Sequence, residues 1–340
     1  MTYSVRRADL NRDRSLLLET LDKHLGVQNG AARFDWLYLQ GVYGEARAFL
    51  LDDEAQGAVA GVAALFPRQF RDNGNTLSGC VFGDFCLAPA SRSLGPGLQL
   101  QRACLEELAN GSLEAAYDFP SAGMQAIYRR LGHTPQAEMV RLARPLRVDR
   151  IVREHVSFAP LSAALAGIGN RVLQGKDVLA RKTSKLSASM YDGEIGEEFA
   201  DLANGLSAGP GLCVYRTAAY LRWRFCQHPC RRYRFITCRR GERLVAYLVF
   251  SAEADQIRIA DICGEVDAAS MAALVSAAVK VGRTFKSEAL SVSLLKEHPW
   301  TESLKDLGFY ERESRPVLLW ATNRGASEKQ WFLTDGDRES

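Results

Sequence analysis

The sequence predicts an α/β (α+β) protein built from two similar units in tandem, each a mixed, mostly antiparallel, twisted sheet flanked by helices. Three observations support this fold class. Candidate strands and helices follow one another in the same order twice. Short motifs from the first half recur at matching places in the second. The chain has 340 residues, a comfortable length for two domains, and its composition (47% hydrophobic, 24% charged) is that of a globular protein.

The first unit is predicted to span residues 1–146. Alternating polar and apolar residues predict a strand at 3–8, and a leucine face predicts a helix at 12–25 that Asp9 or Asn11 can cap. An aromatic second helix follows at 31–40. Asp72-Asn73-Gly74-Asn75 is a typical hairpin turn. It lies between two of the three strands expected at 46–51, 58–70 and 80–87.

The rest of this unit is predicted to contain a strand–helix–strand crossover, which favours parallel neighbours. A helix at 97–109 leads to a strand at 114–119 that ends at Pro120. A short helix at 122–131 stops at Gly132, a residue suited to a left-handed cap. A strand pair at about 137–146 is expected to close the unit.

Residues 147–187 are basic and rich in alanine and leucine, so we expect a helical linker there. The second unit, 188–325, then repeats the order, and residues 326–340 form a tail whose acidic end, 334–340, is expected to be frayed. Asp267 is expected to cap the longest helix of this unit. The unit's helices are expected at 195–206, 217–226, 267–284 and 300–307, its strands at 187–191, 233–239, 243–252, 256–263 and 290–295, and a strand pair at 309–321.

Recurring motifs indicate a tandem duplication. Trp36 lies in an aromatic helix and aligns with Trp223 in another. The strand that carries Asp84 matches the strand that carries Asp261. The alternative is chance similarity between short apolar strings.

A glycine loop distinguishes the first unit from the second. Arg92-Ser93-Leu94-Gly95-Pro96-Gly97 follows a strand and begins a helix, where uncovered backbone N–H groups and the helix dipole favour a phosphate. Pro96 has no N–H and removes one donor. The second unit has only Gly264-Glu265-Val266-Asp267 at this place.

The first unit resembles the GCN5-related N-acetyltransferase (GNAT) superfamily. The resemblance rests on the segment from Leu87 to Gly97, similar to the family's (Q/R)-x-x-G-x-(G/A) loop, and on Tyr128-Arg129-Arg130-Leu131-Gly132-His133. It implies binding of acetyl-CoA or another acyl-CoA, and a general-acid role for Tyr128. The residues implied to bind the cofactor are Leu87, Arg92, Ser93, Leu94, Gly95, Pro96 and Gly97.

Two carboxylates are candidates for the base that deprotonates an amine acceptor. Asp84 lies in an apolar strand and Asp118 near the end of the next, and burial raises the pKa of a carboxyl group toward that of a useful base. Since Asp261 repeats Asp84 in the unit without the loop, a structural role for Asp84 fits equally well.

Nine arginines fall between Arg216 and Arg243, interleaved with aromatic residues. They could hold a phosphorylated or nucleotide-linked acceptor or RNA, or form a solvated surface paired with acids. The formal net charge of +3 argues against nucleic acid. Cys226, His228 and Cys230 lack the paired spacing of a zinc site, so no metal is expected.

Eight cysteines without a disulfide pattern, no apolar leader and no long apolar run predict a cytoplasmic protein with free thiols and no membrane span. The oligomeric state is not indicated. The resemblance implies an acyl-CoA-dependent N-acyltransferase with one cofactor site, acting on an amine such as an amino sugar or a cell-envelope polysaccharide precursor. The alternatives are an aminoacyl-tRNA-dependent transferase, distantly similar to the FemAB type, and a non-catalytic ligand-binding protein on the same fold.

Overall fold

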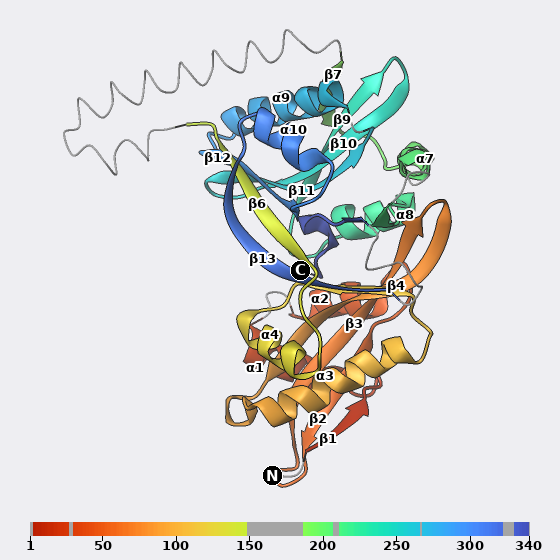
Figure 1. Ribbon diagram of the computed structural model, residues 1–340, viewed down its shortest axis with the longest axis vertical. Coiled ribbons are helices and arrows are strands. Elements are labelled where there is room, and N and C mark those ends of the chain that lie inside the picture. The colour runs from red at the N-terminus through yellow and green to blue at the C-terminus, as the bar shows by residue number, and fades with distance from the viewer. Residues whose placement is uncertain are drawn as a thin grey trace, which may run out of the picture.

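The computed structural model describes residues 3–26, 30–147, 186–206, 211–265, 267–321 and 330–339. The helical linker expected at 147–187 and residues 326–329 of the tail lie almost entirely outside this part of the chain. The described strands form one 14-stranded sheet system that runs through two lobes. The N-terminal lobe is red to yellow and the C-terminal lobe green to blue in Figure 1.

The N-terminal lobe has the predicted order of elements. Side chains of β3 alternate between its two faces: Leu65 packs with the core under α3, whereas Ala64 and Phe66 belong to the core shared with α1 and the second helix. The elements are β1 (Tyr3–Arg7), α1 (Arg14–Leu25), α2 (Gly30–Phe34) with a π-helical turn (Asp35–Leu39), β2 (Arg47–Asp53), β3 (Ala58–Asp72), β4 (Asn75–Leu87), α3 (Leu94–Ala109), β5 (Ala115–Asp118), α4 (Ala122–Arg130) and β6 (Ala137–Pro145).

Two turn predictions in this lobe are confirmed. β3 and β4 form an antiparallel hairpin whose tip holds Asn73 and Gly74 at φ values of 47° and 81°. Gly132 ends α4 with a φ of 83°, a conformation that glycine adopts without a Cβ penalty.

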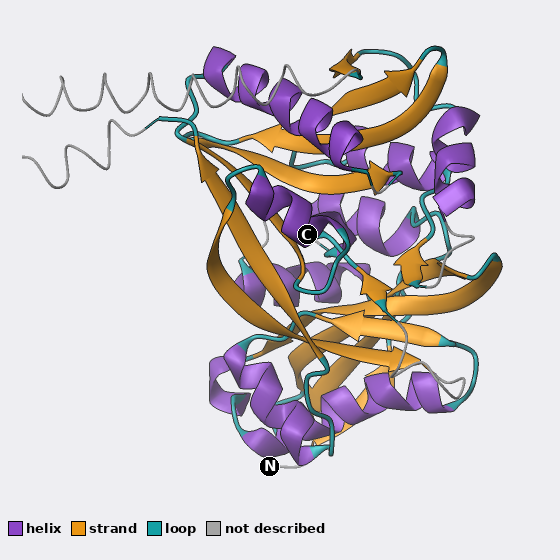
Figure 2. Cartoon of the chain, turned by 45° about the horizontal axis from the view of Figure 1, so that its top comes forward, coloured by secondary structure: helices purple, strands orange, loops and turns teal. Residues whose placement is uncertain are grey.

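The C-terminal lobe repeats the order with one added strand, β8 (Leu212–Val214). Figure 2 shows that helices pack against the strands in both lobes. Its longest helix begins where predicted, since the Asp267 side chain accepts a hydrogen bond of 2.8 Å from the Ser270 N–H. The strand β8 was not predicted. The elements are β7 (Ser187–Tyr191), α7 (Glu197–Leu206), β8 (Leu212–Val214), α8 (Ala218–Leu221) with a π-helical turn (Arg222–Cys226), β9 (Tyr233–Arg240), β10 (Arg243–Ala252), β11 (Gln256–Gly264), α9 (Ala268–Thr284), β12 (Ala289–Leu295), α10 (Trp300–Asp306) and β13 (Tyr310–Ala321).

The two predicted strand pairs are wrong, because β6 and β13 are each a single strand. Nine residues are too few for two strands and a turn. β6 pairs with β12 and β13 of the C-terminal lobe, and the end of β13, from Leu318 to Ala321, pairs with β5 of the N-terminal lobe. In Figure 1 the yellow β6 and the blue β13 run side by side between the lobes. The lobes therefore exchange their last strands.

A reciprocal tryptophan pair lies where the two repeats meet. The rings of Trp36 and Trp223 stack at 4.8 Å between centroids. Each indole N–H donates to the backbone carbonyl of the other residue, at 2.9 and 3.0 Å. The residues that marked the repeat in the sequence thus contact each other across an approximate two-fold relation.

The expectation of a frayed acidic end is also wrong. The C-terminal segment (residues 330–339) contains β14 (Trp331–Phe332) and a short helical turn (Asp335–Asp337), and the C-terminus lies in the middle of the molecule (Figure 1). β14 pairs with β8, which pairs with β3. Asp337 is 0% exposed. Asp337 is buried in spite of its charge because the buried Arg216 forms an ion pair with it at 2.9 Å.

We expect Trp36→Phe to lower the free energy of unfolding by about 1–3 kcal/mol, since it leaves the buried Trp223 carbonyl without its donor. Chemical denaturation measures the change. Trp300→Phe is the matched control. It removes the same ring volume at a tryptophan that makes no hydrogen bond between the lobes in the described part of the chain. Equal losses in the two variants would show that ring volume alone matters.

Candidate active site

A gap opens between β4 and β5 of the N-terminal lobe. The two strands pair in parallel only from Gly79 to Val81, after which β4 continues to Leu87 while β5 ends at Asp118. We call this space the N-terminal opening. It contains a cavity of about 180 Å³. The cavity is lined by Leu25, Ala63, Ala64, Phe82, Gly83, Asp84, Phe85, Gln101, Cys104, Asp118, Phe119, Pro120, Ser121, Met124 and Glu339.

Asp118, which lines this cavity, is hydrogen-bonded to Tyr128, which is fully buried behind the cavity wall. The Tyr128 hydroxyl donates to the Asp118 carboxylate at 2.6 Å and accepts from the Gln101 amide at 2.9 Å. Burial raises the pKa of Asp118 to about 7, against the lowering effect of the Tyr128 hydrogen bond. Burial, with the charge of Asp118, raises the pKa of Tyr128 well above its usual value, so the phenol is protonated at neutral pH. The pair can hold and move one proton.

Asp84, the other predicted carboxylate, is already occupied. Its two oxygens accept hydrogen bonds of 2.7 and 2.8 Å from the Arg33 guanidinium, and Tyr38 donates another at 2.8 Å. Its φ of 49° belongs to a bulge in β4 that turns this carboxylate toward Arg33. These three hydrogen bonds from Arg33 and Tyr38 give Asp84 a structural role in the fold.

The predicted cofactor loop lies beside the opening, at the N-terminus of α3. Arg92, Ser93, Leu94 and Gly95 are exposed, whereas Pro96 and Gly97 are buried. A Cβ on Gly95 would meet nothing within 4 Å, but one on Gly97 would lie 2.7 Å from Ile127. Gly95 therefore leaves the helix end open, and Gly97 allows α3 and α4 to pack. Arg92 steadies the turn through a hydrogen bond of 3.1 Å to the carbonyl of Leu87.

Glu339 is a site residue that the sequence analysis missed. It is half-buried and reaches the cavity from the C-terminal segment. Burial, with the negative charge of Asp84, raises its pKa. The apolar run Trp331-Phe332-Leu333 was the available signal, because such a run anchors a segment to the fold. Gln101 was missed as well, and nothing in its sequence context marks it.

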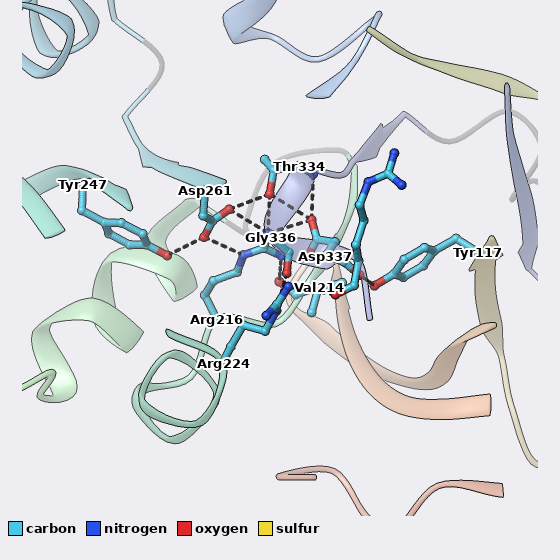
Figure 3. A network of polar contacts seen from close by, with 10 residues as sticks. Tyr117, Val214, Arg216, Arg224, Tyr247, Asp261, Thr334, Gly336 and Asp337 are labelled. Carbon is cyan, nitrogen blue, oxygen red and sulfur yellow. Dashed lines mark hydrogen bonds and ion pairs between the residues drawn. The ribbon is translucent and has the colours of Figure 1, made fainter. Parts of the chain in front are cut away.

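The corresponding opening of the C-terminal lobe is filled by the chain itself. β11 and β12 pair only from Gln256 to Ile259, and the C-terminal segment enters beyond that point. Asp261, the repeat of Asp84, accepts a hydrogen bond of 2.8 Å from Thr334 and an ion pair of 3.0 Å from Arg216 (Figure 3). Arg216 also contacts Asp337 at 2.9 Å. Within the described part of the chain, the C-terminal segment fills the C-terminal opening but leaves a cavity in the N-terminal one.

Most of the arginine-rich stretch serves intramolecular contacts. The buried Arg224 donates to the carbonyls of Gly336 and Arg338 at 2.8 and 3.0 Å. Arg239 pairs with Glu198, and both Arg240 and Arg243 pair with Glu265. The buried Arg224 holds the fold together, whereas Arg240 and Arg243, with side chains 54% and 70% exposed, form surface ion pairs that contribute little to stability.

The Cys226–Cys230 stretch has a structural role at His228. The imidazole Nδ1 accepts hydrogen bonds of 3.1 Å from the N–H groups of Cys230 and Arg231. Burial and the neighbouring Arg224 lower the pKa of His228 to about 3, so the ring is neutral. In the described part of the chain, no three His, Cys, Asp or Glu side chains are placed to hold a metal ion, and no helix is long and apolar enough to cross a membrane.

The fold is that of the GCN5-related N-acetyltransferases. A crystal structure of such an enzyme from Anabaena variabilis matches with a TM-score of 0.65 at 14% identity, covering 95% of this chain and 73% of that one. A probable N-acyltransferase from Enterococcus faecalis matches with a TM-score of 0.63 at 11% identity, covering 94% of this chain and 73% of that one. Saccharomyces cerevisiae N-myristoyltransferase with bound myristoyl-CoA matches with a TM-score of 0.57 at 11% identity, covering 96% of this chain and 88% of that one. No family model and no curated protein match the sequence.

The two carboxylates are expected to behave differently when made neutral. Asp84→Asn leaves the buried Arg33 charge unpaired and should cost about 3–5 kcal/mol of unfolding free energy at every pH near neutrality. Asp118→Asn should instead change the pH dependence. Because the folded pKa of Asp118 is raised, its protonated form stabilises the native state at low pH, and stability falls as pH rises from about 4 through 7.

Denaturation of the wild type and both variants at several pH values between 4 and 8 measures these effects. We expect the wild type to lose stability across this window by more than Asp118→Asn does. Equal slopes would contradict the raised pKa, and a small effect of Asp84→Asn would contradict the structural role of that ion pair.

Proposed function

We propose that this protein is an acyl-CoA-dependent N-acyltransferase with a single acyl-CoA site in the N-terminal lobe. The observation that carries the proposal is the asymmetry of the two openings. Among the described residues, one keeps a cavity that is lined by Asp118, the partner of the buried Tyr128, and it lies beside an exposed helix N-terminus. The other is filled by the C-terminal segment.

The loop at the start of α3 fits the pyrophosphate of coenzyme A. The N–H groups of Leu94 and Gly95 lie in the first turn of an exposed helix end, where anions bind. Pro96 contributes no donor, but it is buried and does not narrow the approach. The edge of β4 beyond Val81, which has no β5 partner, offers backbone groups to an extended acyl-thioester arm.

Asp118 and Tyr128 supply the proton transfers in this proposal. The Asp118 carboxylate accepts a proton from the acceptor ammonium, directly or through water. The amine attacks the acyl carbonyl, the C–N bond forms, and the C–S bond breaks. The Tyr128 hydroxyl gives its proton to the departing sulfur and regains one from Asp118, at 2.6 Å. The second amine proton leaves to water.

The remaining polar groups of the cavity have supporting roles. The charge of Glu339 attracts a cationic amine into the opening. Asp84 is held by Arg33 and positions β4. The cavity of about 180 Å³ suits acetyl or another short acyl group rather than a long chain. We place the reaction in the cytoplasm, where eight free cysteines remain reduced, with an amine such as an amino sugar or an envelope precursor as acceptor.

Gly95→Glu is expected to weaken acetyl-CoA binding at least tenfold, because it places a negative charge beside the pyrophosphate. The added side chain meets open space, so the fold should tolerate it. Gly196→Glu makes the same change in open space just before α7 of the C-terminal lobe and is the matched control. Isothermal titration calorimetry measures both affinities, and equal affinities would place the pyrophosphate elsewhere.

Turnover with an identified amine acceptor tests the proton transfers. The wild type should show an acidic limb in kcat/KM with a pKa of about 7, and Asp118→Asn should abolish that limb. Tyr128→Phe should lower kcat by about 10²–10⁴-fold while acetyl-CoA affinity stays unchanged. A normal kcat in Tyr128→Phe would remove the phenol from the reaction.

A further inference from the structure

A polar trough of about 450 Å³ lies on the sheet between the lobes, on the strands β6, β11, β12 and β13 and against the C-terminal segment. Four of its side chains are arginines and two are carboxylates. Two serines of β12 lie on its floor. The lining residues are Met139, Arg141, Gln256, Arg258, Ser291, Ser293, Glu313, Arg315, Asp335 and Arg338.

The trough carries more positive charge than its own carboxylates can neutralise. Glu313 is shared by Arg141 and Arg315, at 2.6 and 3.3 Å. Asp335 is shared by Arg258 and Arg338, at 2.7 and 3.3 Å. Glu253 contacts Arg258 from outside the trough at 3.6 Å, and a positive excess remains after it is counted.

The pairs on one side of the trough are open to exchange. Arg141, Arg315 and Glu313 have side chains that are 39%, 66% and 42% exposed. Ion pairs at such exposure contribute little to stability, so an incoming anion can compete for the guanidiniums. The planar guanidinium fork matches phosphate geometry with two parallel hydrogen bonds.

The trough adjoins the candidate active site through the C-terminal segment. Arg338 lines the trough, and the next residue, Glu339, lines the cavity of the N-terminal opening. The Arg338 guanidinium carbon lies 4.4 Å from the ring centroid of Phe119, which also lines that cavity. The trough and the cavity lined by Asp118 are therefore neighbours at Arg338 and Glu339.

We propose that the trough binds a phosphate group of the acceptor, so that the substrate is a phosphorylated amine whose phosphate is anchored at Arg141 and Arg315 while its amine enters the N-terminal opening. This inference rests on the proposed acyltransferase function and names its substrate class. It places the phosphate on the strands between the lobes and not on the arginine-rich stretch from Arg216 to Arg243. In that stretch Arg216 and Arg224 are buried in contacts within the fold, and none of its residues lines the trough or the cavity of the N-terminal opening.

Calorimetric titration of the full-length protein with inorganic phosphate tests the proposal. The variants are Arg315→Gln alone and Arg141→Gln with Arg315→Gln, and all of these side chains are exposed enough to be replaced without unfolding. Arg312→Gln is the matched control, since Arg312 lies exposed on the same strand outside the trough. We expect millimolar binding that weakens at least tenfold in the double variant, weakens partly in Arg315→Gln and stays within twofold in Arg312→Gln.

Absence of phosphate binding to the wild type, or equal binding by the double variant, would overturn the proposal. Equal binding would assign the phosphate to another place, such as the start of α3. Acetyl-CoA affinity, measured on the same variants, should not change. If the wild type does not bind acetyl-CoA, the proposed cofactor site is wrong, whereas the phosphate site in the trough is not affected by that result. The two proposals can therefore fail separately.

Discussion

The structure depends on the contact that Arg216 makes with Asp261 and Asp337. All three side chains are buried, and charged groups taken out of water are tolerated only where they are paired and hydrogen-bonded, as Arg216 is with both carboxylates. Arg216 comes from the C-terminal lobe and Asp337 from the C-terminal segment, and the Asp337 carbonyl accepts a hydrogen bond of 2.6 Å from Tyr117 of the N-terminal lobe (Figure 3). This one network therefore fixes the chain end between the lobes. It fills one opening and directs Glu339 into the other.

The exchange of β6 and β13 makes the two lobes a single mechanical unit. Neither lobe can complete its sheet alone, since β5 takes its outer neighbour from β13 and β12 takes its neighbour from β6. A large part of the core is accordingly shared between the lobes. Groups contributed by both halves of the chain can then be held in fixed geometry around one cavity, as catalysis by positioning requires. The two lobes have similar openings, and the course of the C-terminal segment makes these openings different.

Much of this arrangement follows from sequence patterns, and the limits have physical causes. Local signals such as the Asn73-Gly74 turn, the Asp267 cap and the two aromatic helices predicted element types and bounds well, because each depends on neighbouring residues. The strand exchange could not be predicted, because the residues of an edge strand do not specify which of two sheets the strand pairs with. The prediction of a frayed C-terminal segment is wrong because acidic residues indicate exposure to solvent unless their arginine partners are known. At the site, the sequence indicates Asp118 as a candidate base and Tyr128 as a candidate acid independently of each other. Only the fold shows that the two side chains are hydrogen-bonded.

The central claim is that the chain has one acyl-CoA site, in the N-terminal opening, because its own C-terminal segment fills the corresponding opening of the C-terminal lobe. Native mass spectrometry of the full-length protein with increasing acetyl-CoA tests this claim most directly, because it counts the bound molecules per chain. The account predicts that one molecule binds and that a second does not at concentrations where the first is saturated. Two bound molecules per chain would show that the C-terminal opening is accessible, and none would show that the N-terminal opening is not a coenzyme A site.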